Sequence, residues 1–122
     1  MSNSVYQYSL ETIFVHLQIC NKRFSNIENP SDFIDTENGL ILLDSIVTRL
    51  QAIGELVKNT LKINSNLQVN YPEIDWNNII RFRDFISHHY EMLDYEIVFE
   101  ICNNFLPKLE NAIQLELNKY AT

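Results

Sequence analysis

The sequence predicts an all-α protein, folded as a four- or five-helix up-and-down bundle. Apolar residues make up 46% of the 122 residues and are spread evenly along the chain, mostly at helical spacing. Only two glycines and three prolines interrupt it, a composition typical of long helices joined by a few loops. The length suits one hydrophobic core, so we expect residues 1–122 to form a single domain.

The first helix is predicted over residues 5–23. Its apolar residues recur at steps of three, four and seven: Leu10, Ile13, Phe14, Leu17 and Phe24. A polar stretch over residues 25–38, around Pro30, predicts a loop. We expect that loop to return Phe33 and Ile34 to the core.

The second helix is predicted over residues 36–63. Its apolar positions alternate steps of three and four, as in a coiled-coil seam: Leu40, Leu43, Val47, Leu50, Gly54, Val57 and Leu61. A glycine inside a helix costs about 1 kcal/mol, so a packing reason for Gly54 is expected. The missing side chain would let another helix come close, or Gly54 would be a simple core contact.

The third helix is predicted to follow a polar stretch at residues 64–72. Asp75 is its candidate N-cap, and the helix should run to about His89. Its apolar face comprises Trp76, Ile79 and Ile80. We expect Trp76 to be a core anchor rather than a platform for a nucleic-acid base.

The fourth helix is predicted after a break near residues 91–94, with Asp94 as its cap. Its apolar stripe comprises Ile97, Val98, Ile101, Phe105, Leu109, Ile113 and Leu117. Pro107 interrupts this helix. Because proline lacks an N–H and clashes with the preceding turn, Pro107 should kink or split the segment.

Charge and cysteine content limit the function. The net charge of −7 argues against a broad electrostatic grip on nucleic acid, so any RNA contact must be local. Cys20 and Cys102 are far apart and have no histidine at metal-ligand spacing, so we expect reduced core thiols, no metal and no cofactor. The chain begins without a signal-peptide pattern and has no apolar run of about 20 residues, so a cytoplasmic protein outside the membrane is expected.

Acid–base and anion-binding groups are concentrated at residues 83–90, which read Arg-Asp-Phe-Ile-Ser-His-His-Tyr in the order R-x-x-x-x-H-x-Y. His88, with an ordinary pKa of about 6.5, could take the proton of a ribose 2′-hydroxyl at neutral pH. Arg83 could hold a non-bridging phosphate oxygen and stabilise the pentacoordinate phosphorus. These groups predict RNA cleavage that needs no metal and yields a cyclic phosphate.

The same residues also have a structural interpretation. His88 and His89 would lie favourably at a helix C-terminus, and Arg83 would pair with Asp84 or Glu91 on a solvated face.

The spacing of the motif bears on assembly. On one straight helix, Arg83 and His88 point about 140° apart. They converge if the helix breaks near the motif, or if a two-fold axis brings the same segment of a second subunit alongside. We therefore expect a homodimer formed through the helices that flank the motif.

Several segments occur in the order of a known family. They are Leu50-Gln51-Ala52-Ile53-Gly54-Glu55, Tyr71-Pro72-Glu73-Ile74-Asp75-Trp76, Arg83-Asp84, His88-His89-Tyr90, Leu93-Asp94-Tyr95-Glu96-Ile97-Val98 and Phe105-Leu106-Pro107-Lys108-Leu109. Together they resemble the HepT-like branch of the HEPN superfamily, from about Asp32 to Ile113.

The resemblance implies a helical homodimer that acts as an RNA-cleaving toxin of a type VII-like toxin–antitoxin pair. Its antitoxin would be a minimal nucleotidyltransferase of the MntA type, which silences the toxin by AMP transfer to the motif tyrosine. Carried over by position, this makes Arg83 and His88 catalytic and Tyr90 the modification site. The added nucleotide would fill the RNA site, and its negative charge would repel the substrate.

Two residues depart from the family pattern, in which asparagine commonly stands at the position of Asp84 and a small or polar residue at that of His89. Asp84 could orient Arg83 or raise the pKa of a histidine. His89 is a second candidate imidazole, but Tyr90 fixes the H-x-Y register in favour of His88.

The alternative function is a non-catalytic helical adaptor that recruits a nucleotidyltransferase. The acidic charge suits an adaptor, whereas Arg83, His88 and Tyr90 together favour the nuclease. Two further residues have expected roles: His16 as a partly exposed helix residue rather than a ligand, and Glu55 as a candidate buried partner for the motif arginine.

Overall fold

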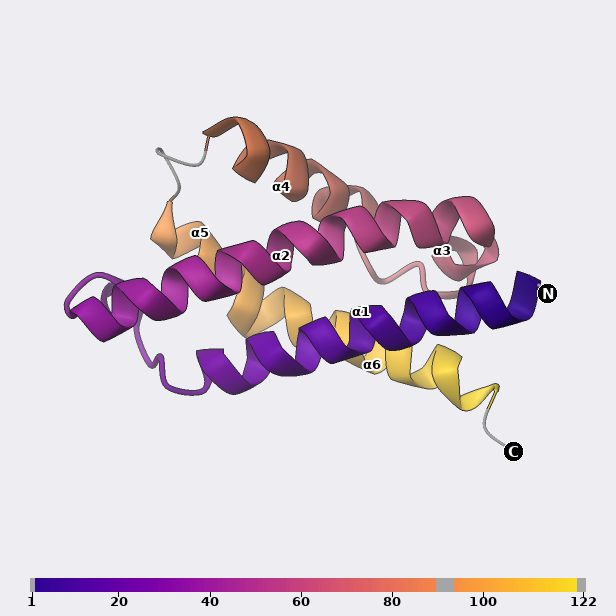
Figure 1. Ribbon diagram of the computed structural model, residues 1–122, viewed down its shortest axis with the longest axis horizontal. Coiled ribbons are helices and arrows are strands. Elements are labelled where there is room, and N and C mark those ends of the chain that lie inside the picture. The colour runs from indigo at the N-terminus through magenta and orange to yellow at the C-terminus, as the bar shows by residue number, and fades with distance from the viewer. Residues whose placement is uncertain (1, 90–93, 121–122) are drawn as a thin grey trace.

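The computed structural model describes residues 2–89 and 94–120, and every regular element in these two ranges is helical (Figure 1). The long segments run side by side in alternating directions. They are α1 (Ser2–Phe24), α2 (Glu37–Ile63), α4 (Trp76–His89) and a C-terminal run of α5 (Tyr95–Glu100), a π-helix (Ile101–Phe105) and α6 (Leu106–Asn118). The predicted all-α class is confirmed for this part of the chain, in which no helix is long and apolar enough to cross a membrane.

The loop between α1 and α2 contains a 3₁₀ helix, Pro30–Phe33, that directs Phe33 into the core. The prediction that Ile34 also returns to the core is wrong, because 44% of its surface is exposed. A 3₁₀ helix turns by about 120° per residue, so the position after an inward residue points away from the core. Thr36 then caps α2 by accepting a hydrogen bond from the Gly39 N–H at 2.9 Å.

The buried face of α2 is wider than the predicted seam. It packs against α1 and α4, and its buried residues are Gly39, Leu43, Ile46, Val47, Leu50, Ile53, Gly54, Val57 and Thr60. Leu40 is exposed, contrary to prediction, because the buried register begins one residue earlier. A Cβ atom at Gly39 would overlap the Asp32 carbonyl oxygen, so the loop lies over position 39 and leaves position 40 outside.

The polar stretch between α2 and α4 includes a short helix, α3 (Asn66–Asn70), which was not predicted from the sequence. Its Leu67 is fully buried and anchors the connection. Asp75 accepts a hydrogen bond from the Asn78 N–H at 3.1 Å, as predicted for a cap. Trp76 is a core anchor, as predicted: it is 2% exposed and its Nε1 donates to the Tyr71 carbonyl at 2.9 Å.

The C-terminal run begins at Asp94, whose side chain accepts a hydrogen bond from the Glu96 N–H at 2.8 Å. Pro107 lies at the start of α6, directly after the π-helix, in which the Leu106 N–H donates to the Ile101 carbonyl five residues earlier. Because proline cannot continue the ordinary ladder, the helix widens by one residue before it. The predicted interruption of the α-helix is found as this π-helix, and the helical run continues through it into α6 without a split.

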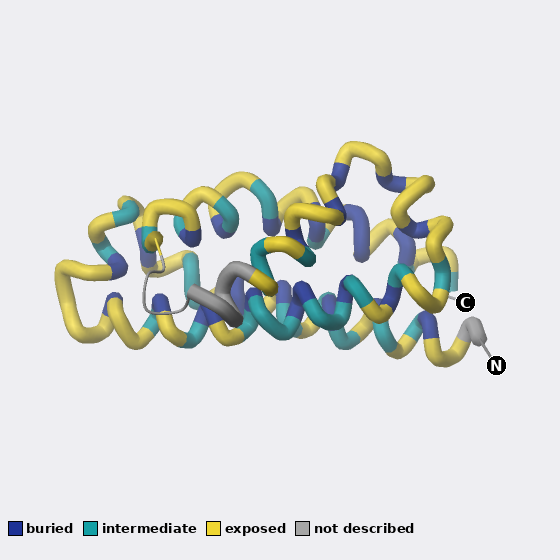
Figure 2. The backbone as a smooth tube through the Cα atoms, turned by 90° about the horizontal axis from the view of Figure 1, so that it is seen from above, coloured by how far each residue is buried: buried dark blue, intermediate teal, exposed yellow. Residues whose placement is uncertain are grey.

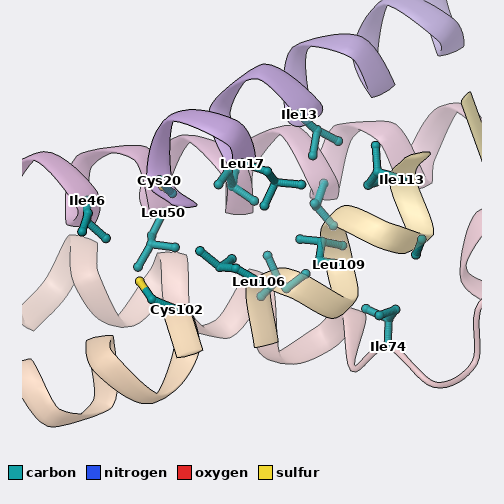
Figure 3. Close-up of a cluster of buried hydrophobic side chains, with 14 of the residues drawn as sticks. Ile13, Leu17, Cys20, Ile46, Leu50, Ile74, Cys102, Leu106, Leu109 and Ile113 are labelled. Carbon is teal, nitrogen blue, oxygen red and sulfur yellow. The ribbon is translucent and has the colours of Figure 1, made fainter. Parts of the chain in front are cut away.

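The core lies along the axis of the bundle, and buried residues form inward stripes on each long helix (Figure 2). Figure 3 shows Ile13, Leu17, Ile46, Leu106 and Leu109 converging from three helices. Cys20 and Cys102 are buried free thiols, as predicted. Burial raises the pKa of Cys20 to about 12, so this thiol stays protonated at neutral pH.

One buried acid ties three parts of the chain together. Glu116 on α6 is 3% exposed and accepts hydrogen bonds from the hydroxyls of Tyr6, at 2.8 Å, and Tyr71, at 3.1 Å. Lys119 Nζ lies 2.9 Å from the same carboxylate. Burial opposes ionisation of Glu116, but the hydrogen bonds from Lys119, Tyr6 and Tyr71 outweigh it and lower the Glu116 pKa. The cluster joins α1, α6 and the segment before α4.

Candidate functional site

Helices α2 and α4 approach each other closely at Gly54. A Cβ atom at Gly54 would overlap the Cβ atom of Arg83 and would lie 3.1 Å from the Ile79 carbonyl oxygen. The glycine therefore makes room for another helix, which was the first of its two interpretations. The stem of Arg83 leaves α4 directly over this position.

Two carboxylates contact the Arg83 guanidinium. Nη2 lies 3.0 Å from Glu55 Oε2 on α2, and Nη1 donates to Asp84 Oδ1 at 2.7 Å. The side chains of Arg83, Glu55 and Asp84 are 31%, 45% and 52% exposed, so the group lies at the surface of the α2–α4 contact. The hydrogen bond with Asp84 and the nearby Glu55 charge raise the pKa of Arg83, so its positive charge is secure at any physiological pH.

These contacts test three of the expectations for Arg83. Asp84 does contact Arg83, in agreement both with an orienting role and with a solvated ion pair. Glu55 is confirmed as an arginine partner: its Oε2 atom is shielded from solvent, although its side chain as a whole is 45% exposed. Glu91, the other predicted partner, lies outside the described residues.

The backbone of α4 is helical without a break from Trp76 to His89. Arg83 and His88 are therefore on one continuous helix, separated by about 140° around its axis and about 7.5 Å along it. A helix break was one of the two arrangements expected to bring Arg83 and His88 together, and α4 has no such break. The side chains of His88 and His89, together with Tyr90 as a whole, lie outside the described residues.

A groove that was not predicted from the sequence lies between α2, α4 and the C-terminal run. Its volume is about 320 Å³. It is lined by Leu50, Ile53, Asn78, Ile79, Arg81, Phe82, Ile97, Ile101, Phe105, Leu106 and Leu109. Ile97 was predicted to lie in the core but is 46% exposed, because the space in front of it is this groove. Two of the polar residues that line the groove, Arg81 and Asn78 on α4, are hydrogen-bonded: Arg81 Nη2 donates to Asn78 Oδ1 at 2.6 Å.

Another polar contact involves His16 and Arg49. His16 on α1 is half-buried, and its Nδ1 lies 3.2 Å from Arg49 Nη1. Because arginine can only donate, His16 Nδ1 is the acceptor, and burial and the Arg49 charge lower the His16 pKa. Residues 2–89 and 94–120, as far as they are described, contain no group of three or more His, Cys, Asp or Glu residues placed to hold a metal ion.

Comparison with known proteins points to one family. The model of the family described as Ribonuclease HepT-like matches residues 17–115, which include all of α2 and α4. "Putative RNase MJ0127" of Methanocaldococcus jannaschii is 34% identical over 90 residues, or 66% of this chain and 72% of that protein. "Putative RNase TTE0752" of Caldanaerobacter subterraneus subsp. tengcongensis is 29% identical over 103 residues, or 84% and 88% of the two chains. No solved structure matches this chain.

Proposed function

Because the chain belongs to the ribonuclease HepT-like family, we propose that it is an endoribonuclease that cleaves RNA without a metal ion. The observation that carries this proposal is the fixed position of Arg83, whose guanidinium is held at the surface of the α2–α4 contact, five residues before His88 on the same helix. A permanently charged planar fork in this position suits a phosphate group.

In the proposed reaction, His88 takes the proton from a ribose 2′-hydroxyl, and the 2′-oxygen attacks the adjacent phosphorus. Arg83 donates hydrogen bonds to the non-bridging oxygens, where negative charge builds up in the transition state. The bond to the 5′-oxygen breaks, and this leaving oxygen receives a proton from a second imidazole. The products are a 2′,3′-cyclic phosphate and a 5′-hydroxyl end.

A second copy of the chain would supply that second imidazole. One continuous α4 directs positions 83 and 88 about 140° apart, so a single helix does not aim both at one phosphate. A two-fold axis beside α4 would place His88 of the partner subunit near Arg83. The apolar groove between α4 and the C-terminal run supports such a contact, because a second subunit would cover its exposed Ile97.

Regulation by a partner enzyme is the next part of the proposal. The protein would be the toxin of a type VII-like pair, and an MntA-like nucleotidyltransferase would silence it by transferring AMP to Tyr90. The support is the position of this phenol, two residues after His88 in the R-x-x-x-x-H-x-Y order. An added phosphate there would compete with RNA for Arg83.

RNA cleavage by two matched variants tests the proposed roles. His88→Ala should abolish cleavage of a labelled RNA without changing the thermal unfolding midpoint, whereas His89→Ala should keep most of the activity. An inactive His89 variant beside an active His88 variant would show that His89, and not His88, is the catalytic histidine. A wild-type protein that cuts no RNA with or without its partner would contradict the nuclease function itself.

A non-catalytic adaptor for a nucleotidyltransferase is the second candidate, and one observation favours it. Glu55 and Asp84 place two negative charges on the single positive charge of Arg83, in a chain of net charge −7. That balance disfavours phosphate binding until one carboxylate moves aside. Tight binding of the partner without any RNA cleavage would establish the adaptor function.

A further inference from the structure

Consecutive residues of α2 act on different parts of Arg83. Gly54 leaves room for the start of the side chain, because any Cβ there would overlap the Arg83 Cβ and lie 3.1 Å from its Cγ. Glu55, the next residue, meets the other end of the same side chain, with Oε2 3.0 Å from Nη2. The Gly-Glu pair thus constrains both the stem and the head of Arg83.

The two carboxylates that contact Arg83 differ in how they can restrain its guanidinium. Asp84 is the neighbour of Arg83 on α4, so this pair moves together with that helix. Glu55 belongs to α2, and its Oε2 atom is shielded from solvent and accepts no hydrogen bond from the described residues, so its contact with Nη2 is an ion pair. Exposed ion pairs are worth little because water screens them, whereas a shielded oxygen holds its partner more firmly. Of these two carboxylates, Glu55 is therefore the one that links the guanidinium to another helix.

We propose that Glu55 is a positioning residue for Arg83: it anchors Nη2, so that the Nη1 side of the guanidinium, now on Asp84, is presented to an RNA phosphate. This inference rests on the proposed ribonuclease function. An arginine has five N–H donors in a rigid plane, so anchoring one terminal nitrogen sets the direction of the others. Asp84, the more exposed partner, is displaced from Nη1 when phosphate binds.

The two carboxylates should then affect different kinetic constants. Glu55→Gln removes the anchoring charge with little change in shape, and we expect kcat to fall by about 10- to 100-fold, since misplacing a catalytic group by about 1 Å can cost that much. KM should change little. Asp84→Asn removes the competitor for phosphate, so KM should fall while kcat is largely kept.

A second variant separates position from charge. Glu55→Asp keeps the carboxylate but shortens the side chain by one methylene, which moves the oxygen away from Nη2. We expect it to lower kcat as Glu55→Gln does. Glu11→Gln is the matched control, because Glu11 is exposed on α1 and its loss also changes the net charge from −7 to −6. The control should leave kcat and KM unchanged.

A double-variant cycle shows whether Glu55 acts through Arg83. In an Arg83→Ala background, adding Glu55→Gln should cause no further loss of kcat. Nitrogen-15 NMR of the Arg83 guanidinium supplies a readout that does not depend on activity: rotation of the terminal nitrogens should be slow in the wild-type protein and fast in Glu55→Gln.

The outcomes distinguish this inference from the proposed function. A wild-type protein that cuts no RNA contradicts the nuclease, and the NMR comparison then still decides whether Glu55 restrains Arg83. If the wild-type protein cuts RNA, wild-type kcat in both Glu55 variants overturns the inference. A Glu55→Gln effect that is equally large without Arg83, or equal guanidinium rotation in the two proteins, also overturns it.

Discussion

The Cβ atom of Arg83 occupies the space that a side chain at position 54 would need. This contact between α4 and α2 sets where the guanidinium meets Glu55, so helix packing and the candidate phosphate site depend on the same glycine.

Gly54→Ala should therefore destabilise the fold and reduce RNA cleavage. Alanine in place of a helix-interior glycine normally stabilises by about 1 kcal/mol, so the expected loss of about 1–3 kcal/mol from overpacking would reverse the usual sign. Urea unfolding measures the change. Asn59→Ala, at an exposed position of α2, is the control and should be neutral or slightly stabilising. A stabilised Gly54→Ala protein would show that α4 does not press on this position.

The sequence predicted features that depend on local chemistry. The caps at Asp75 and Asp94 and the interruption of the α-helix before Pro107 are found, because each is decided by a residue and its near neighbours. Asp84 was also a candidate partner of Arg83 from sequence adjacency alone.

Features that depend on how the helices pack against one another were predicted less well. Leu40 and Ile97 fit apolar periodicity yet are exposed, since periodicity does not say whether another segment lies over a residue. The groove in front of Ile97 was missed for the same reason. Ile34, expected to return to the core with its loop, is exposed as well. Glu55 was a candidate partner of the motif arginine from its place beside Gly54, but its reach to Nη2 follows from the helix crossing at Gly54.

The Glu116 cluster predicts an acid-dependent loss of stability. The folded protein holds the pKa of Glu116 below its usual 4.5, so its contribution is present above that pH and is lost as the pH falls through the lowered value. Glu116→Gln should cost about 1–3 kcal/mol at neutral pH, because its buried hydrogen-bond partners lose a charged acceptor. Urea unfolding of both proteins between pH 7 and about pH 3 measures this difference, which should shrink in acid. A difference that does not change with pH would show that ionisation of Glu116 contributes nothing.

Dimerisation should depend on the apolar groove. Ile97→Glu places a charge where a second subunit would cover the surface, so we expect a monomer in sedimentation and a loss of RNA cleavage. Leu115→Glu is the matched control, because Leu115 on α6 is similarly exposed, at 48% against 46%, and lies outside the groove. A wild-type monomer with full nuclease activity would rule out the composite site.

Silencing by a partner should depend on the Tyr90 hydroxyl. Co-expression with an MntA-like nucleotidyltransferase should add mass in AMP units at Tyr90 and stop RNA cleavage. Tyr90→Phe should keep nuclease activity and escape silencing, as intact mass, peptide mapping and cleavage assays on the same samples would show. Neutralisation with Tyr90 unmodified would mean that the partner inhibits by binding alone.

If Arg83 and His88 cleave RNA by attack of the ribose 2′-hydroxyl, the RNA ends should carry the mark of that chemistry. The most direct measurement is mass spectrometry of the RNA ends produced by the wild-type protein in EDTA, beside Arg83→Lys, which keeps the charge but loses the planar fork. We expect 2′,3′-cyclic phosphate and 5′-hydroxyl ends from the wild type and little cleavage by the lysine variant. Cleavage that requires added magnesium and leaves 3′-hydroxyl ends, or full activity in Arg83→Lys, would contradict this mechanism.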